Sequence, residues 1–297
     1  MRTTDGRPDL AEDRRGPRRR WIGPVLLVAV AAAVVMGGLL AFRAVTRAVF
    51  SPTCQATAAG SSVSFTPEQT ANAALIAAIS ARRGLPPRAA TIALATSIQE
   101  SKLRNLTYGD RDSLGLFQQR PSQGWGTREQ ILDPAYSTSS FYDALLKVSG
   151  YETRNITEVA QQVQHSGYPQ AYAEHEPEGR ILASTLTGRS PAAVGCRLKP
   201  VERAADGAAV GADLEAQLGT KPVQDGAQLT LRGASVEQAW AAGQWAVARA
   251  EAYGIDRVQV GDKVWQRSID EGAMTWSAAS GAPSPMSVTI RIGAPTG

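Results

Sequence analysis

The stretch that decides the fold is Ser97-Ile98-Gln99-Glu100-Ser101, followed by Ser113-Leu114-Gly115-Leu116-Phe117-Gln118-Gln119. The preceding run, from Ala89 to Ile98, is rich in Ala, Ile and Leu and contains no Gly or Pro. It predicts a helix that begins at Pro86 and Pro87 and carries Glu100 in its last turn. The negative end of the helix dipole disfavours an ionised glutamate, and burial beside Phe117 would raise its pKa further. Glu100 is therefore a candidate general acid that works near neutral pH.

These segments resemble the motifs of soluble lytic transglycosylases and goose-type lysozymes. That pattern reads, in order, Glu-Ser, Gly-Leu-Met-Gln and Ala-Tyr-Asn-Ala-Gly. This chain has Glu100-Ser101, then Gly115-Leu116-Phe117-Gln118 with Phe in place of Met, and then Val163-Gln164-His165-Ser166-Gly167, which matches only in its small residues and final glycine. The resemblance spans roughly Thr66 to Gly188. It implies a mainly helical lysozyme-like domain that acts on the glycan strands of peptidoglycan.

The same resemblance implies that one glutamate suffices. Glu100 would protonate the glycosidic oxygen and then accept the proton of the sugar's own 6-hydroxyl, which closes an anhydro ring. Asp110 and Asp112 are alternatives for a second carboxylate, although Gly109 to Ser113 has ordinary turn composition. The implied substrate-binding residues are Gln118, Gln119, Gln164, His165 and Tyr172, of which Gln119 is the one that could point away.

Gln164-His165 stands where the family has Tyr-Asn, and this departure leaves two classes of function open. The first is an enzyme, either a transglycosylase or a lysozyme. The second is a catalytically silent protein that binds peptidoglycan or acts as a scaffold while keeping the saccharide cleft. Tyr172 is a candidate replacement for the missing aromatic residue, with a core position as the alternative.

The N-terminal segment predicts the cellular compartment of the protein. Trp21 to Phe42 holds no ionisable residue, and its 22 residues would extend about 33 Å as a helix, enough to cross a hydrocarbon core of about 30 Å. The basic cluster from Arg14 to Arg20 is expected on the cytoplasmic side, so the rest would face outward from the cell membrane. A cleaved signal peptide is the alternative, but its apolar core is usually shorter, and no clear cleavage site precedes Arg43.

Charge and motif content exclude several function classes. The chain has a net charge of +4, of which the first 20 residues contribute +3 and Arg43 and Arg47 contribute +2, so the remainder is −1. An outer part that is nearly neutral gives no support for nucleic-acid binding. His165 and His175 lack the Cys, His or carboxylate spacing of a metal site, and no cofactor-binding motif occurs.

Cys54 and Cys196 are the two cysteines of the chain, and both lie beyond the predicted membrane span. In an oxidising exterior we expect them to form a disulfide. It would close a loop of 143 residues, for which chain entropy predicts on the order of 5 kcal/mol at most. Two unpaired thiols are the alternative, because sequence alone does not show that the Cα atoms come close enough.

Composition and breaker residues predict an α+β protein built from six segments. Thr66 and Ser235 each open a helix with the spacing of a capping box, and short β-rich runs follow Gln228. The predicted segments are a cytoplasmic basic tail (1–20), a transmembrane helix (21–42), a stalk (43–65), the lysozyme-like domain (66–198), a linker (199–226) and a small α+β domain (227–297). The last of these carries no motif with evident chemistry, and we expect it to fold alone.

Overall fold

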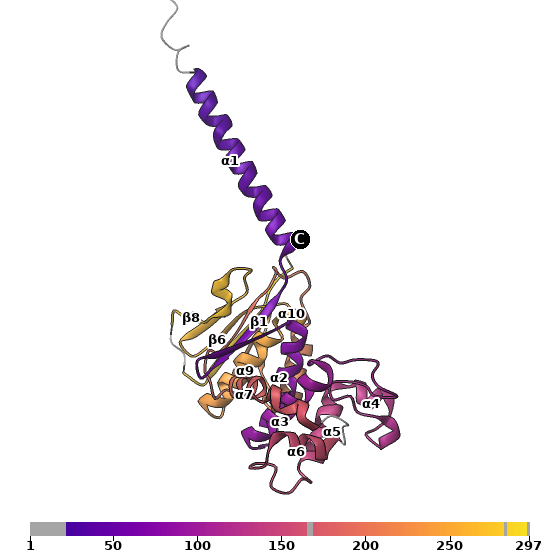
Figure 1. The fold of residues 1–297 in the computed structure, drawn as a ribbon. Helices are drawn as coiled ribbons and strands as arrows, with labels where there is room; N and C mark the ends of the chain where they lie inside the picture. Colours follow the sequence, from indigo (N-terminus) through magenta and orange to yellow (C-terminus); the bar gives the residue numbers. More distant parts are fainter. Residues whose placement is uncertain (1–21, 165–168, 282–283, 296–297) are drawn as a thin grey trace, which may run out of the picture. The chain divides into compact units, whose positions relative to one another are not determined.

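The computed structural model describes residues 22–164, 169–281 and 284–295, and the chain divides into two compact units, 1–50 and 51–297 (Figure 1). The first unit contains α1 (Ile22–Val49), a helix of 28 residues. The predicted basic tail, 1–20, and Trp21 lie outside the described residues. Within the part of the chain that the structure describes, no helix is both long enough and apolar enough to cross a membrane.

The second unit has the predicted mixture of helices and strands. It begins with a three-stranded antiparallel sheet in the order β2-β1-β3, formed by β1 (Thr53–Ala58), β2 (Ser61–Phe65) and β3 (Val194–Arg197). The sequence predicts a stalk over 43–65, whereas most of this segment is the β1–β2 hairpin. Alternate residues of β1, namely Cys54, Ala56 and Ala58, are buried. Their small side chains give a strand core without the large apolar residues that usually signal one.

Helices follow the hairpin as predicted. Thr66 and Gln69 form the predicted capping box at the start of the first of them: the Thr66 hydroxyl accepts from the Gln69 backbone, and the Gln69 side chain accepts from the Thr66 backbone. The helices are α2 (Pro67–Arg82), α3 (Pro87–Ser101), α4 (Arg128–Leu132), α5 (Pro134–Leu145), α6 (Ile156–Gln164) and α7 (Glu176–Leu186), with 3₁₀ helices η2 (Pro121–Gln123) and η3 (Pro169–His175). Every residue of α3 from Ala89 to Ile98 is buried, so α3 is the central helix of this group.

A six-stranded antiparallel sheet makes up the rest of the unit, in the order β4-β5-β9-β6-β7-β8. A hairpin turn at Gly261-Asp262 joins two of its strands. The elements are α8 (Gly207–Leu218), β4 (Val223–Asp225), β5 (Gln228–Arg232), α9 (Val236–Ala248), α10 (Ala250–Tyr253), β6 (Ile255–Val260), β7 (Lys263–Gln266), η4 (Glu271–Met274), β8 (Ser277–Ala278) and β9 (Ser287–Ile292). The predicted linker, 199–226, therefore contains a helix and a strand.

The packing around α9 differs from the predicted layout of two separate domains. This helix contacts α2 and α7 on one side and β6 and β9 on the other, so both predicted domains share one core (Figure 1). Gln244 of α9 is fully buried; its side chain accepts from the Ala193 backbone at 2.8 Å and donates to the Thr185 carbonyl at 2.5 Å. Gly188 lies so close to α9 that a Cβ there would be 1.9 Å from the Glu237 carbonyl oxygen.

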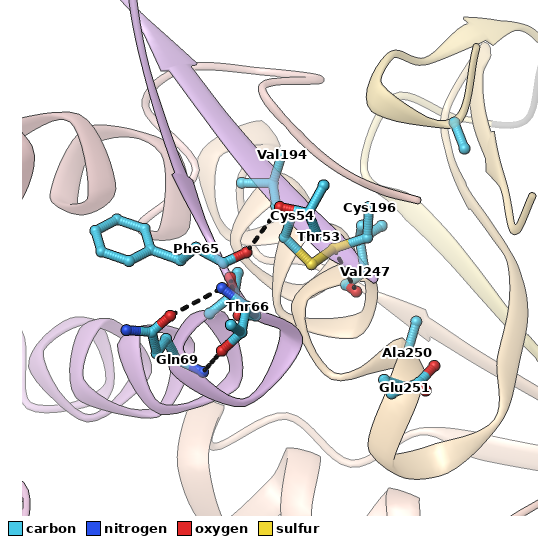
Figure 2. The surroundings of a disulfide bond; sticks show 12 residues. Thr53, Cys54, Phe65, Thr66, Gln69, Val194, Cys196, Val247, Ala250 and Glu251 are labelled. Atoms are coloured by element: carbon cyan, nitrogen blue, oxygen red, sulfur yellow. Dashed lines mark hydrogen bonds between the residues drawn. A yellow bond between two sulfur atoms is a disulfide. The ribbon is translucent and has the colours of Figure 1, made fainter. Parts of the chain in front are cut away.

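The predicted disulfide between Cys54 and Cys196 is confirmed. The two residues face each other across the β1–β3 ladder with their Cα atoms 4.0 Å apart, and both are buried. Figure 2 shows the bond beside Val247 of α9 and near the capping box that starts α2. The cross-link therefore joins the two ends of the region that holds α2 to α7.

Candidate active site

Glu100 is the second-last residue of α3, and the chain turns sharply after it. Lys102 and Leu103 both adopt left-handed backbone conformations, with φ angles of 53° and 59°, which are uncommon for residues with long side chains. Two side chains of α2 bind the carbonyl groups of this turn: Gln69 donates to the Lys102 carbonyl and Asn72 to the Leu103 carbonyl, each at 2.8 Å. The end of α3 is therefore fixed by a neighbouring helix.

The loop that carries Gly115 to Gln118 is attached to the same turn of α3. The hydroxyl groups of Ser97 and Ser101 lie 3.1 and 2.7 Å from the Leu116 carbonyl oxygen and donate to it. Gly115 has a φ of +75°, and a Cβ at this position would lie 2.7 Å from the Ile131 carbonyl oxygen. Only glycine fits both the conformation and the space, which explains why the loop has glycine where it passes Ile131 of α4.

The Glu100 carboxyl group is half-buried between this loop and η3. The Tyr172 hydroxyl donates to its Oε1 at 2.5 Å, and the Gln164 side chain also hydrogen-bonds to it. Burial raises the pKa of Glu100, and the hydrogen bonds from Tyr172 and Gln164 lower it by less, so the pKa stays above its ordinary value. Such a carboxyl group keeps its proton to a higher pH than a solvated one, as a general acid requires.

Tyr172 and Gln164 thus act on Glu100 directly. Tyr172 is fully buried, and its hydroxyl reaches Glu100 across 72 positions of sequence. Gln164, at the end of α6, donates from Nε2 to the Phe117 carbonyl oxygen at 2.6 Å and so joins α6 to the loop. His165, the other predicted contact in this segment, lies outside the described residues.

The two neighbouring amides of the loop have different environments. Gln118 is half-buried with a φ of 48°, and its Nε2 lies 3.3 Å from the carbonyl oxygens of Tyr108 and Gly115. Gln119 is 1% exposed, and its Nε2 donates to the Ser137 carbonyl at 3.1 Å. The structure therefore leaves Gln118 half-buried and places Gln119 in the core, where it holds the loop to α5.

Asp110 and Asp112, the alternatives for a second catalytic carboxylate, have other roles in the loop. Asp112 accepts from Arg120 at 2.7 Å and from the Ser122 backbone at 2.8 Å. These bonds hold the pKa of the Asp112 carboxyl well below its usual range, and they close the loop on itself. The Asp110 side chain is 90% exposed and lies 3.9 Å from Arg111. Glu100 is thus the carboxyl group with a raised pKa at this site.

Several residues of the site were not singled out in the sequence. Gln69 and Asn72 of α2 hold the turn after α3, and Ser97 of α3 holds the loop; the available signal was the polar residues on otherwise Ala-rich helices. His175, at the junction of η3 and α7, has Nδ1 2.7 Å from Glu178 Oε2 and Nε2 3.1 Å from Gln99 Oε1. Among the described residues, no cluster of His, Cys, Asp or Glu could hold a metal ion.

No protein-family model matches the chain, and no curated protein matches it.

Proposed function

We propose that this chain is a membrane-anchored cell-wall enzyme that cleaves the glycan strands of peptidoglycan, with Glu100 as its single catalytic acid. The observation that carries the proposal is the Glu100 carboxyl group, which ends a buried helix, has a raised pKa and accepts a hydrogen bond from Tyr172. The resemblance of Glu100-Ser101 and Gly115 to Gln118 to lytic transglycosylases and goose-type lysozymes supports the same assignment.

In the proposed reaction, protonated Glu100 gives its proton to the glycosidic oxygen while the bond from that oxygen to the anomeric carbon breaks. The electron pair of the bond leaves with the oxygen, so positive charge develops on the sugar ring. The sugar's own 6-hydroxyl then attacks the anomeric carbon and gives its proton to the Glu100 carboxylate. This closes an anhydro ring and restores the acid, whereas attack by water would leave a reducing end.

The predicted substrate-binding residues have different roles in this proposal. Gln118 is half-buried, and its Nε2 would have to exchange its contacts with the Tyr108 and Gly115 carbonyl groups to bind a saccharide. Tyr172 and Gln164 orient the Glu100 carboxyl group, so Tyr172 takes the place of the aromatic residue that the family has near Gln164. In this proposal Glu100 is the one carboxyl group that takes part in the chemistry. The oxygens of Asp112 are occupied by Arg120 and Ser122, so Asp112 does not serve as a second one.

An extracytoplasmic location is part of the proposal. The uncharged run from Trp21 to Phe42 supports a membrane anchor, and the preceding basic cluster supports a cytoplasmic N-terminus. The Cys54–Cys196 disulfide supports an oxidising compartment for residues 51–297, because such bonds persist mainly outside the cytosol.

The test is mass spectrometry of muropeptides released from purified peptidoglycan by the full-length chain in mild detergent. We expect new chain ends, anhydro for a transglycosylase or reducing for a lysozyme. Glu100→Gln keeps the shape but removes the transferable proton, so it should lower cleavage by at least about a hundredfold. Glu158→Gln makes the same chemical change on α6, where the side chain is 64% exposed, and should leave cleavage intact.

Two results would contradict the enzyme. One is retained cleavage by a properly folded Glu100→Gln protein. The other is the release of no new ends by the native chain; if that chain still binds the wall, the catalytically silent wall-binding protein would be favoured.

A further inference from the structure

His175 makes a second attachment between η3 and the last turn of α3, close to Glu100. The first attachment is the hydrogen bond from Tyr172 to Glu100, and the second joins His175 Nε2 to Gln99 Oε1 at 3.1 Å. Gln99 directly precedes Glu100, and Tyr172 and His175 lie three residues apart on η3. The two attachments therefore hold the same short helix to the same turn.

The imidazole ring of His175 lies between two side-chain oxygens. Nδ1 faces the Glu178 carboxylate at 2.7 Å, and Nε2 faces the side-chain oxygen of Gln99. Both partners are hydrogen-bond acceptors, whereas a neutral imidazole carries only one N–H. The arrangement in which both bonds form is thus that of the imidazolium. When His175 loses a proton, either one bond is lost or the Gln99 amide must turn over.

Among the charged groups near the His175 ring, Glu178 is the carboxylate that contacts it. Arg88 and Arg180 both contact Glu176, at 2.6 and 2.7 Å, so these three residues form their own ion cluster. The charged and titratable groups on the elements packed against His175 are Arg88 and Glu100 of α3, Glu158 of α6, Glu174 and Tyr172 of η3, and Glu176, Glu178 and Arg180 of α7.

We propose that His175 is a positioning residue whose protonated ring holds η3 against α3 and thereby keeps the Tyr172 hydroxyl on Glu100. The link is complete while both ring nitrogens carry a proton and loses a bond when one proton leaves, so it weakens as pH rises. The Tyr172 hydrogen bond lowers the pKa of Glu100, so a link that weakens as pH rises would let that pKa rise and would oppose the alkaline loss of the acid form. Only this catalytic consequence rests on the proposed function.

The test measures Tyr172 itself, in full-length chain that carries Glu100→Gln so that residue 100 no longer titrates. NMR of ¹³C-labelled tyrosine rings, assigned with Tyr172→Phe, should show Tyr172 signals that move between pH 5 and 8. Adding His175→Gln, which supplies a side-chain donor that does not titrate, should abolish the movement. A movement that survives His175→Gln, or no movement before it, would overturn the proposal.

Cleavage by chains with native Glu100 gives a second measurement. In His175→Gln the Tyr172 hydroxyl should stay on Glu100 across the pH range, so the alkaline fall in kcat should move to lower pH than in the native chain, with KM little changed. An unchanged pH profile would contradict the link. If the native chain cleaves nothing but Tyr172 still follows His175, the proposed enzyme fails and the His175 link stands. His175→Asn is the second variant in case His175→Gln does not fold.

Discussion

Removing the Cys54–Cys196 disulfide should lower the free energy of unfolding substantially. The two residues are separated by 142 positions, and for a loop of this length chain entropy predicts a stabilisation of about 5 kcal/mol. A denatured chain that keeps some contacts loses less entropy, which reduces this figure. Both residues are buried, so lost packing acts in the opposite direction. For the double variant Cys54→Ala and Cys196→Ala we expect a loss of about 3 to 5 kcal/mol.

The assay is urea unfolding of the full-length chain, followed by the fluorescence of its six tryptophans. Thermal unfolding gives a second readout. In a folded unit of this size, each kcal/mol lost from the free energy of unfolding lowers the melting temperature by roughly 2–4 °C, so we expect a fall of about 6 to 20 °C. The native chain is the control: once unfolded and reduced, it should refold to the stability of the double variant. A loss below about 1 kcal/mol with an unchanged dependence on urea would refute the argument, because it would mean that the link constrains the unfolded chain very little.

Two further predictions concern the site and the shared core. Tyr172→Phe removes a hydrogen bond that lowers the pKa of Glu100, so the pKa should rise further and the alkaline fall of cleavage should move to higher pH; a fall that moves to lower pH would contradict this assignment. Deleting residues after Leu198 should prevent cooperative folding, because α2 and α7 lose the face of α9 and the Thr185 carbonyl loses Gln244. A truncated chain with a sharp thermal transition in circular dichroism would argue against the shared core.

Local signals account for the parts of the fold that the sequence predicts well. Pro86 and Pro87 start α3, and the segment up to Ser101 contains no residue that breaks a helix. The capping box at Thr66 and the Ser235 cap, whose hydroxyl accepts from the Gln238 backbone, rely on residues three positions apart, so they can be recognised without tertiary structure. Gly254 ends α10 with a φ of +67°, a conformation that glycine adopts without strain.

Long-range packing accounts for what the sequence does not predict. Cys54, Ala56 and Ala58 have small side chains, so β1 is a strand because β3 lies beside it and not because of its own propensity. The segment 199–226 has the composition of a linker, yet its apolar residues Val210 and Leu214 are buried in the shared core. The contact of Tyr172 with Glu100 joins residues 72 positions apart, and no local pattern specifies it.

The turn after Glu100 has a consequence for the flexibility of a proton donor. Helix C-terminal residues usually fray, because their carbonyl groups have no partner within the helix. Here the carbonyl groups of Lys102 and Leu103 are held by Gln69 and Asn72, so the backbone that carries Glu100 is preorganised by α2. The conformational entropy of the acid's backbone is thus lost once, when the chain folds, and is not lost again in each encounter with a substrate.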